Sequence, residues 1–249
     1  SNILNHHHRY PTFIKKMEKI FSQIQIQIKE NFSSYEIYQI FKKNPRFLLF
    51  LFKENIITIN EDILSVMLKT TIIYLFPETA QKMKLIEDIP ENYKEKQLIG
   101  ENEDLISQLI RNDSIEEFIS YITKNDYPLD SKILESNFET NFFLIKRQNQ
   151  TTLIEYAAFF GSIQIFNYLY MNNVELTPSL WLYAIHSNNA EMIHFLEEKD
   201  VKPPNDSYKE CIKESIKCHH NDITKYFQSN LIVADDIDDI YLYHFHYYN

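Results

Sequence analysis

The stretch IEYAAFFGSIQIFNYLYMNNVELTPS, from Ile154 to Ser179, decides the fold of this chain. It contains Gly161, one of only two glycines among 249 residues. Tight β-hairpin turns favour glycine or an Asn-Gly pair, so this chain has little turn chemistry for a sheet. Low glycine together with much Leu, Ile, Lys and Glu favours helices. The composition therefore predicts an all-α protein. The presence of glycine at position 161 then requires a specific structural reason.

The pattern around Gly161 recurs along the chain. A second copy lies 27 residues later, a third follows after a further 31 residues around His219, and a partial copy lies 47 residues earlier, from Ser114 to Tyr127. The first two copies align Thr152, Ala157, Ala158, Gly161, Ile165, Phe166, Leu169, Asn173 and Val174 with Ser179, Ala184, Ile185, Asn188, Met192, Ile193, Leu196, Asp200 and Val201. Self-similarity at a period of about 30 residues is typical of helical-repeat solenoids.

Each copy is expected to form a helix, a tight turn, a second helix and a loop. Gly161 and Asn188 stand at the turn, and both residue types tolerate left-handed backbone. Two pairs predict capping boxes at helix starts, Ser114 with Glu117 and Asn188 with Glu191. About four such units between residues 98 and 230 would stack into a solenoid, interrupted by an insert near 129–150.

The best copy resembles an ankyrin repeat, whose pattern is roughly T-P-L-H-x-A-A-x-x-G-H-x-x-[IV]-V-x-x-L-L-x-x-G-A-D. The residues at matching positions are Thr152, Ala157, Ala158, Gly161, Ile165, Phe166 and Leu169. The chain departs from the pattern at Leu153–Glu155, which replace Pro-Leu-His, and at Asn173, which replaces the second glycine. The resemblance implies an ankyrin-type solenoid.

The wider sequence resembles a large, divergent family of ankyrin-type proteins expanded in parasitic protists. The segments that carry this resemblance are NDSIEEFISYI, TTLIEYAAFFGSIQIF, LTPSLWLYAIHSNNAEMIHFLEE and ESIKCHHNDITKYF. It covers about 100–230 strongly and 10–95 more weakly. The resemblance implies a helical N-terminal region followed by a few degenerate repeats, and a role in protein binding with no activity attached.

The N-terminal region, residues 10–95, is expected to hold about five short helices. Apolar spacings of 3 and 4 predict a helix over 12–30, although QIQIQIK (Gln23 to Lys29) also alternates like a strand. Ser33 and Glu36 form a potential capping box, and Asn44-Pro45 is expected to end the helix that follows. The remaining expected helices cover FLLFLF (47–52), which should be buried, then 60–76, capped by Asn60, and 79–89.

The C-terminal segment, residues 231–249, combines an acidic run with alternating aromatic residues. The last repeat of a solenoid needs a cap to shield its open core. The acidic run could begin a capping helix, because carboxylates favour helix N-termini. Cover of the solenoid end by the aromatic tail and contact of that tail with a partner are left as equal alternatives.

Charge and hydropathy exclude several classes of partner. The net charge is −10, and residues 96–249 alone carry −12, which should repel nucleic acid and anionic lipid. The longest apolar runs are six residues, far short of a membrane span of about 20. No secretory signal is evident, and two cysteines cannot form a disulfide framework, so we expect a cytoplasmic protein.

Catalytic and metal motifs are absent from the sequence. It has no G-x-S-x-G, no H-E-x-x-H and no glycine-rich phosphate loop, so we do not expect an enzyme or a cofactor. Cys211, Cys218, His219 and His220 could suggest zinc, but the cysteines are seven residues apart and lack the usual C-x₂₋₄-C spacing. We therefore expect core cysteines and a turn histidine rather than a metal site.

The expected function is a non-catalytic module that binds a protein partner through the concave face and loop tips of the solenoid. Because this region is acidic, the partner is expected to present a basic surface, and a small-molecule ligand is not expected. Trp181 is either a partner contact or a core anchor between helices, and Tyr183 lies on another helix face, so that one of the two is expected to face the concave side. The alternatives are a permanently buried component of a larger, possibly cytoskeletal, assembly and an enzyme of unrecognised type. The candidate contact residues are Glu175, Thr177, Trp181, Tyr183, Lys202, Asp206 and Tyr208.

Overall fold

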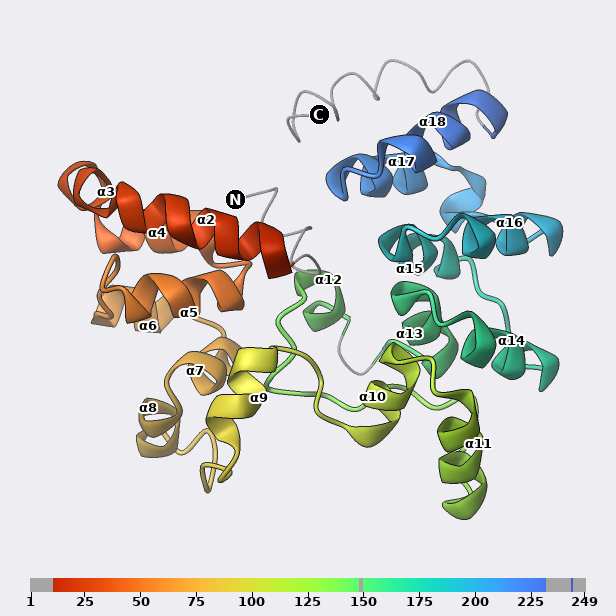
Figure 1. Ribbon diagram of the computed structural model, residues 1–249, viewed down its shortest axis with the longest axis horizontal. Helices are drawn as coiled ribbons and strands as arrows, with labels where there is room; N and C mark the ends of the chain where they lie inside the picture. Colours follow the sequence, from red (N-terminus) through yellow and green to blue (C-terminus); the bar gives the residue numbers. More distant parts are fainter. Residues whose placement is uncertain (1–10, 148–149, 232–242, 244–249) are drawn as a thin grey trace. The chain divides into compact units, whose positions relative to one another are not determined.

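A computed structural model describes residues 11–147 and 150–231 together with Tyr243 (Figure 1). All regular secondary-structure elements within these residues are helices. One isolated antiparallel β-bridge joins Lys132 to Thr152. The predicted all-α class is therefore confirmed for the described part of the chain. No helix in this part is long and apolar enough to cross a membrane.

The chain divides into two compact units. Of the described residues, unit 1 comprises 11–103 and 135–147, and unit 2 comprises 104–134, 150–231 and Tyr243. The division therefore falls after 103, and 135–147, the greater part of the expected insert, belongs to unit 1. The proposed cap at 231–249 lies outside the described residues except for Leu231 and Tyr243.

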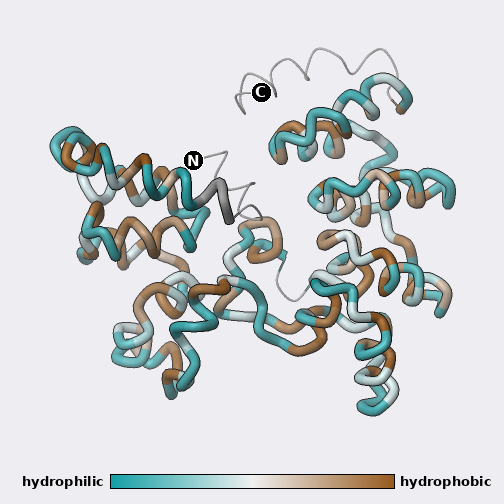
Figure 2. Tube along the Cα trace, in the orientation of Figure 1, coloured by the Kyte–Doolittle hydropathy of each residue, from teal (hydrophilic) through white to brown (hydrophobic). Residues whose placement is uncertain are grey.

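Unit 1 is a set of short helices. They are α2 (Pro11–Gln23), α3 (Gln25–Asn31), α4 (Ser34–Phe41), α5 (Pro45–Lys53), α6 (Glu61–Val66), α7 (Lys69–Leu75), α8 (Pro77–Lys82), α9 (Tyr93–Ile99) and α12 (Phe142–Ile145). Brown and teal segments alternate along the helices in Figure 2, as expected of helices with one buried side.

Local signals in unit 1 were read correctly at three places. The segment QIQIQIK is helical, although Ile24 breaks it into α2 and α3. Ser33 and Glu36 form the expected capping box at the start of α4. The run FLLFLF lies in α5, where Phe47, Leu48, Leu49 and Leu51 are buried.

The helix boundary expected at Asn44-Pro45 is present, since α4 ends at Phe41, and Asn44 also begins α5, where its side chain accepts a hydrogen bond from the Phe47 backbone amide at 2.9 Å. Two other expectations for unit 1 were wrong. The single helix expected over 60–76 is divided at Met67, whose extended backbone separates α6 from α7. The helix expected over 79–89 is α8, which starts earlier, at Pro77, and ends at Lys82.

Aromatic side chains join the helices of unit 1. Phe21 lies edge-on to Phe41 and Phe47, with ring centroids 5.5 and 5.1 Å apart, and Phe52 packs edge-on against Phe76 at 4.8 Å. Such edge-to-face pairs each add about 0.5–1.5 kcal/mol beyond the area that they bury. The aromatic residues therefore connect α2, α4 and α5, with a second contact from α5 to the residue that follows α7.

Unit 2 contains four helical hairpins among its described residues. They are hairpin 1 (α10, Leu105–Arg111, and α11, Ile115–Lys124), hairpin 2 (α13, Leu153–Phe160, and α14, Ile163–Met171), hairpin 3 (α15, Leu180–Ser187, and α16, Ala190–Glu198) and hairpin 4 (α17, Lys209–Lys217, and α18, Asn221–Asn230). A 3₁₀ turn, η1 (Pro204–Asp206), precedes hairpin 4. The first helices contact one another in series, α10 with α13, α13 with α15 and α15 with α17 (Figure 1).

The turn of every hairpin contains one residue with left-handed backbone. These residues are Asp113, Gly161, Asn188 and His219, with φ of 51°, 70°, 53° and 55°. The predicted turn roles of Gly161, Asn188 and His219 are confirmed. In hairpin 1 the residue is Asp113 and not Ser114, because α11 is one residue longer than α14 and α16.

Capping at the helix starts differs from the prediction. Ser114 precedes α11 but makes no side-chain capping bond. In hairpin 3 the cap is Asn189, whose side chain accepts from the Glu191 amide at 2.9 Å, because Asn188 itself is left-handed. A full capping box does form at α13, between Thr152 and Glu155. The prediction thus missed the register by one residue at α16, whereas at α11 it had the right residue, Ser114, without the capping bond.

The first helix of hairpin 2 is enclosed by its neighbours. All residues of α13 from Leu153 to Phe159 are buried, including Ala157 and Ala158. The small alanine side chains let adjacent helices approach closely. At the turn, a Cβ atom placed on Gly161 would lie 3.3 Å from Ser187 Cβ in hairpin 3. Hairpin 2 therefore packs tightly against hairpin 3 at both the helix and the turn.

Candidate functional site

Five of the seven predicted contact residues lie at the surface of unit 2. Glu175, Lys202 and Asp206 are exposed, and Thr177 and Tyr208 are half-buried. They come from two loops, the one between α14 and α15 and the one between α16 and α17. The structure therefore leaves these loops accessible, as a partner-binding role would require.

Trp181 is a core anchor and not a surface contact. Its side chain is 0% exposed, and its indole N–H donates to the Val201 carbonyl at 2.8 Å. Its ring packs edge-on against Tyr208, with centroids 5.3 Å apart, and also against Phe227. The indole thereby joins hairpin 3 to hairpin 4. The suggestion that Trp181 faces a partner is wrong for this conformation.

Tyr183 is also buried, with 2% of its surface exposed. Its hydroxyl lies 3.0 Å from the Thr151 hydroxyl, just before α13. This hydrogen bond joins hairpin 3 to the start of hairpin 2. The burial of Tyr183 contradicts its expected role as a partner contact.

The two surface loops are held by local polar contacts. The Thr177 and Ser179 hydroxyls lie 2.7 Å apart, and Ser179 donates to the buried Glu155 carboxylate. In the second loop, Lys202 donates to Asp200 at 2.8 Å, and this hydrogen bond raises the pKa of Lys202. The contact with Glu155 joins the first loop to α13, whereas the Lys202–Asp200 pair is exposed and restrains the second loop little.

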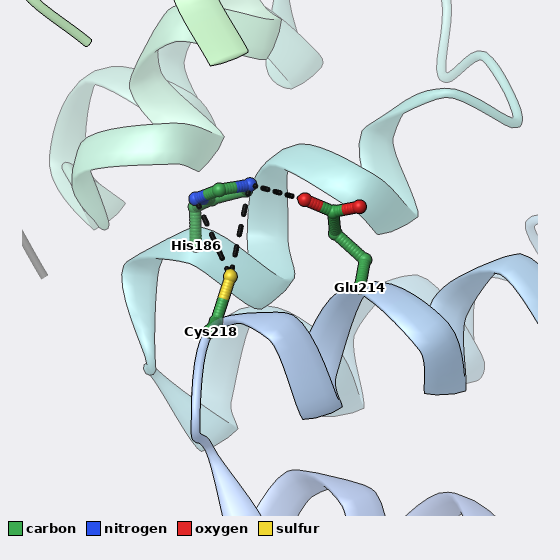
Figure 3. Close-up of side chains that lie close together, drawn as sticks. All are labelled: His186, Glu214 and Cys218. Atoms are coloured by element: carbon green, nitrogen blue, oxygen red, sulfur yellow. Dashed lines mark hydrogen bonds and ion pairs between the residues drawn. The ribbon is translucent and has the colours of Figure 1, made fainter. Parts of the chain in front are cut away.

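A second candidate site lies inside unit 2, where hairpins 3 and 4 meet. His186, near the end of α15, and Glu214 and Cys218, at the end of α17, form the His186 cluster (Figure 3). The His186 Nε2 atom is 3.1 Å from Glu214 Oε1. The Cys218 sulfur is 3.6 Å from Nδ1 and 3.8 Å from Nε2 of the same ring. All three residues are buried.

Charge is concentrated around Glu214. The Lys217 ammonium donates to the second carboxylate oxygen, Oε2, at 2.6 Å. Burial raises the pKa of Glu214, but the hydrogen bond and charge of His186, with those of Lys217, outweigh burial and hold this pKa well below its ordinary value. Glu214 is therefore a carboxylate at neutral pH and is held by a group on each oxygen.

The His186 ring is held between two neighbours. The Phe159 ring stacks on it, with centroids 4.9 Å apart and planes 26° apart. The Cys218 sulfur is almost equally far from both ring nitrogens and lies over the ring in Figure 3. A sulfur in the ring plane at equal distances from both nitrogens would collide with Cε1, so the contact is with the ring face. Hairpins 2, 3 and 4 thus meet at His186.

Sequence reasoning missed this cluster. It considered Cys218 together with Cys211, His219 and His220 and left out His186, which is 32 residues before Cys218. Cys211 is not a member; it is buried in α17, and burial raises the pKa of its thiol. Spacing along the chain carries no signal for a site assembled from two helices. Only knowledge of which helices stack could have identified it.

Unit 1 has an open pocket of about 920 Å³. Leu49, Phe52, Leu75 and Phe76 are among its lining residues, together with charged side chains and the segment 89–95. Burial raises the pKa of Tyr93, one of the lining residues, and its hydroxyl donates to the Ile73 carbonyl. Tyr93 thus has a structural partner for its only ionisable proton.

Comparison with known proteins identifies no relative. No family model matches the chain, and neither a curated protein nor a solved structure matches it.

Proposed function

We propose that unit 2 is an ankyrin-type solenoid that acts as a non-catalytic protein-binding module. The observation that carries the proposal is the regular series of hairpins, each with a left-handed turn residue and each stacked through its first helix. Such arrays bury one continuous core and present loops and outer helices as an extended surface. Protein binding is the use for which that surface is best suited.

The surface chemistry favours a partner with basic groups. Exposed carboxylates outnumber exposed ammonium groups along the loops and outer helices of hairpins 1 to 4. The exposed acidic residues include Glu116, Glu117, Glu175, Glu191, Glu198, Asp200, Asp206 and Asp222. Complementary charge speeds association and selects among partners more than it adds affinity. We place the contact at the loops that carry Glu175 and Asp206.

The proposal is tested by affinity capture from the source cell followed by mass spectrometry. A loop variant, Glu175→Lys with Asp206→Lys, is compared with an outer-helix control of equal charge change, Glu116→Lys with Glu117→Lys. All four residues are exposed, and lysine is strained at one of them alone, Asp206 with φ of 54°, so neither variant should unfold the chain. We expect the loop variant to lose a protein that the wild type and the control retain. Retention of the same proteins by both variants would refute the loop assignment.

The alternative, a permanent component of an assembly, is favoured by a specific feature of unit 1. Exposed large apolar side chains on α2, α3, α4 and their connections include Ile20, Ile24, Ile26, Phe32 and Ile40. Exposed apolar side chains that lie together often mark interaction sites. Gel filtration with light scattering separates the two functions, because a stable monomer favours the transient module and an obligate oligomer favours the assembly.

A further inference from the structure

We infer that the His186 cluster binds one zinc-like divalent transition-metal ion, with His186, Glu214 and Cys218 as ligands. The ion would join hairpin 3 to hairpin 4 from inside unit 2. This site is independent of the proposed loop surface, since it lies in the core and uses none of the loop residues.

The donor set selects the class of metal. Imidazole nitrogen, carboxylate oxygen and thiolate sulfur are the three types of ligand that proteins use for Zn²⁺. A thiolate disfavours Mg²⁺ and Ca²⁺, which prefer sets made only of oxygen. Three protein ligands leave one position of a tetrahedral ion for water or another donor. The residues therefore favour zinc or an ion of similar softness.

The distances suit a single ion. The donor atoms of the three residues lie within 4.8 Å of one another. An ion about 2.0–2.3 Å from each donor requires neighbouring donors to be roughly 3–4 Å apart. His186 Nε2 and Glu214 Oε1, at 3.1 Å, already meet this requirement, and Cys218 Sγ is 3.8 Å from Nε2. The sulfur now lies over the ring face, so rotation about χ1 of Cys218 must bring it toward Nε2 and Oε1.

The surroundings hold the ligands in place. Lys217 donates to Oε2 of Glu214 and leaves Oε1 directed at His186, as an outer-shell partner does for a ligating carboxylate. Phe159 stacks on the imidazole and fixes the plane of its ring. Cys218 is 1% exposed, so an ion bound beside it would be shielded from bulk water. Removing an outer-shell partner typically lowers metal affinity by about 10–100-fold.

The test uses Co²⁺ as a spectroscopic substitute for Zn²⁺ with the reduced full-length chain. His6, His7 and His8 are replaced by alanine in every protein, because adjacent histidines near a terminus can bind Co²⁺ adventitiously. We expect one equivalent of Co²⁺ to give the near-ultraviolet charge-transfer band of a thiolate ligand. The band should disappear in Cys218→Ser and persist in Cys211→Ser, a matched control in α17, the helix that Cys218 follows.

Two further variants test the other ligands. His186→Ala and Glu214→Ala should each weaken Zn²⁺ binding, measured by competition with a chromogenic chelator, by about tenfold or more. In addition, Zn²⁺ should raise the thermal midpoint of the parent protein, followed by Trp181 fluorescence, and leave that of Cys218→Ser unchanged. This last comparison does not depend on the spectrum of a bound ion.

Three results would overturn the inference. The first is that the parent protein shows no saturable binding of Co²⁺ or Zn²⁺. The second is a thiolate band that survives in Cys218→Ser. The third is an equal rise of the thermal midpoint with Zn²⁺ in the parent protein and in Cys218→Ser. In each case His186, Glu214 and Cys218 would be a packing contact between hairpins 3 and 4 and nothing more.

Discussion

Replacement of Gly161 by alanine is the sharpest test of the hairpin repeat. Gly161 adopts φ of +70° at the turn between α13 and α14. An L-residue with a Cβ atom is strained there, at a cost of about 1–2 kcal/mol. Alanine also stiffens the unfolded chain, which offsets about 0.4–1 kcal/mol of that cost. The expected loss of unfolding free energy is therefore about 1 kcal/mol from the backbone alone.

The neighbouring hairpin adds to this loss. The new Cβ would lie 3.3 Å from Ser187 Cβ, a contact tighter than most, so hairpin 3 must move slightly. Gly161→Asn separates the two causes, because asparagine brings the same Cβ and yet tolerates left-handed backbone. We expect Gly161→Asn to cost less than Gly161→Ala. Equal losses would assign the effect to the contact with Ser187.

The assay is urea unfolding followed by the fluorescence of Trp181, the only tryptophan in the chain. Trp181 is buried in unit 2, so its signal reports the unfolding of this unit. Asn188→Gly is the matched control: the same left-handed turn in hairpin 3 should accept glycine with a change within about 0.5 kcal/mol. A wild-type midpoint for Gly161→Ala at unchanged m-value would refute the assignment of a strained turn.

Three further predictions follow from individual contacts. Asp113→Ala removes the carboxylate that accepts from the Gln164 and Ile165 amides at 3.1 and 3.0 Å, so urea unfolding should show a loss of about 0.5–2 kcal/mol from these bonds. The left-handed backbone of Asp113 adds a further cost for alanine, and asparagine, which tolerates this backbone, should recover part of the loss. Trp181→Phe removes the indole donor to a buried carbonyl and should cost about 1–3 kcal/mol, measured by circular dichroism. Glu214 has a lowered folded-state pKa, so it stabilises the fold above pH 4.5, its ordinary pKa, and this contribution is lost as the pH falls below that value. Acid titration of stability should therefore be shallower for Glu214→Gln, and identical curves would contradict the pairing.

Periodicity was sufficient to place the hairpins of unit 2. Each copy of the repeat needs a residue with left-handed backbone at the sharp turn between its two helices. Gly161, Asn188 and His219 could therefore be aligned as turn residues from the sequence. Register was less secure, because one extra residue in α11 shifts the turn to Asp113 without disturbing the apolar pattern. Local chemistry thus predicts that a turn exists better than it predicts which residue occupies it.

Two features, the break at Met67 and the burial of Trp181, could not be predicted from the sequence for a different reason. The apolar positions before and after Met67 continue one helical stripe, so periodicity carries no mark of the extended residue there. A tryptophan at the start of a repeat is compatible either with a partner contact or with packing in the core. Its N–H found the Val201 carbonyl, 20 residues away, and that pairing depends on how hairpins 3 and 4 stack. Both features are decided by tertiary contacts.

The His186 cluster shows what the repeat register can contribute once the stacking is known. When the hairpins are aligned on their left-handed turn residues, Arg111 and His186 occupy the same position, two residues before the turn. Each contacts the residue five before the turn in the following hairpin: Arg111 donates to the Tyr156 hydroxyl at 3.0 Å, and His186 pairs with Glu214 at 3.1 Å.

The same two positions of the repeat, two residues before one turn and five before the next, are therefore in contact at two junctions and hold different side chains. The fold brings these two positions together at both junctions, while the residue types decide what the junction can do. Arg111 with Tyr156 offers a neutral hydroxyl to a guanidinium, and this pair holds two hairpins together. His186 with Glu214 offers two donors for a metal, and Cys218, one residue before the next turn, supplies a third. The repeat therefore supplies the place for a site, and the divergence of hairpins 3 and 4 from the common pattern supplies its chemistry.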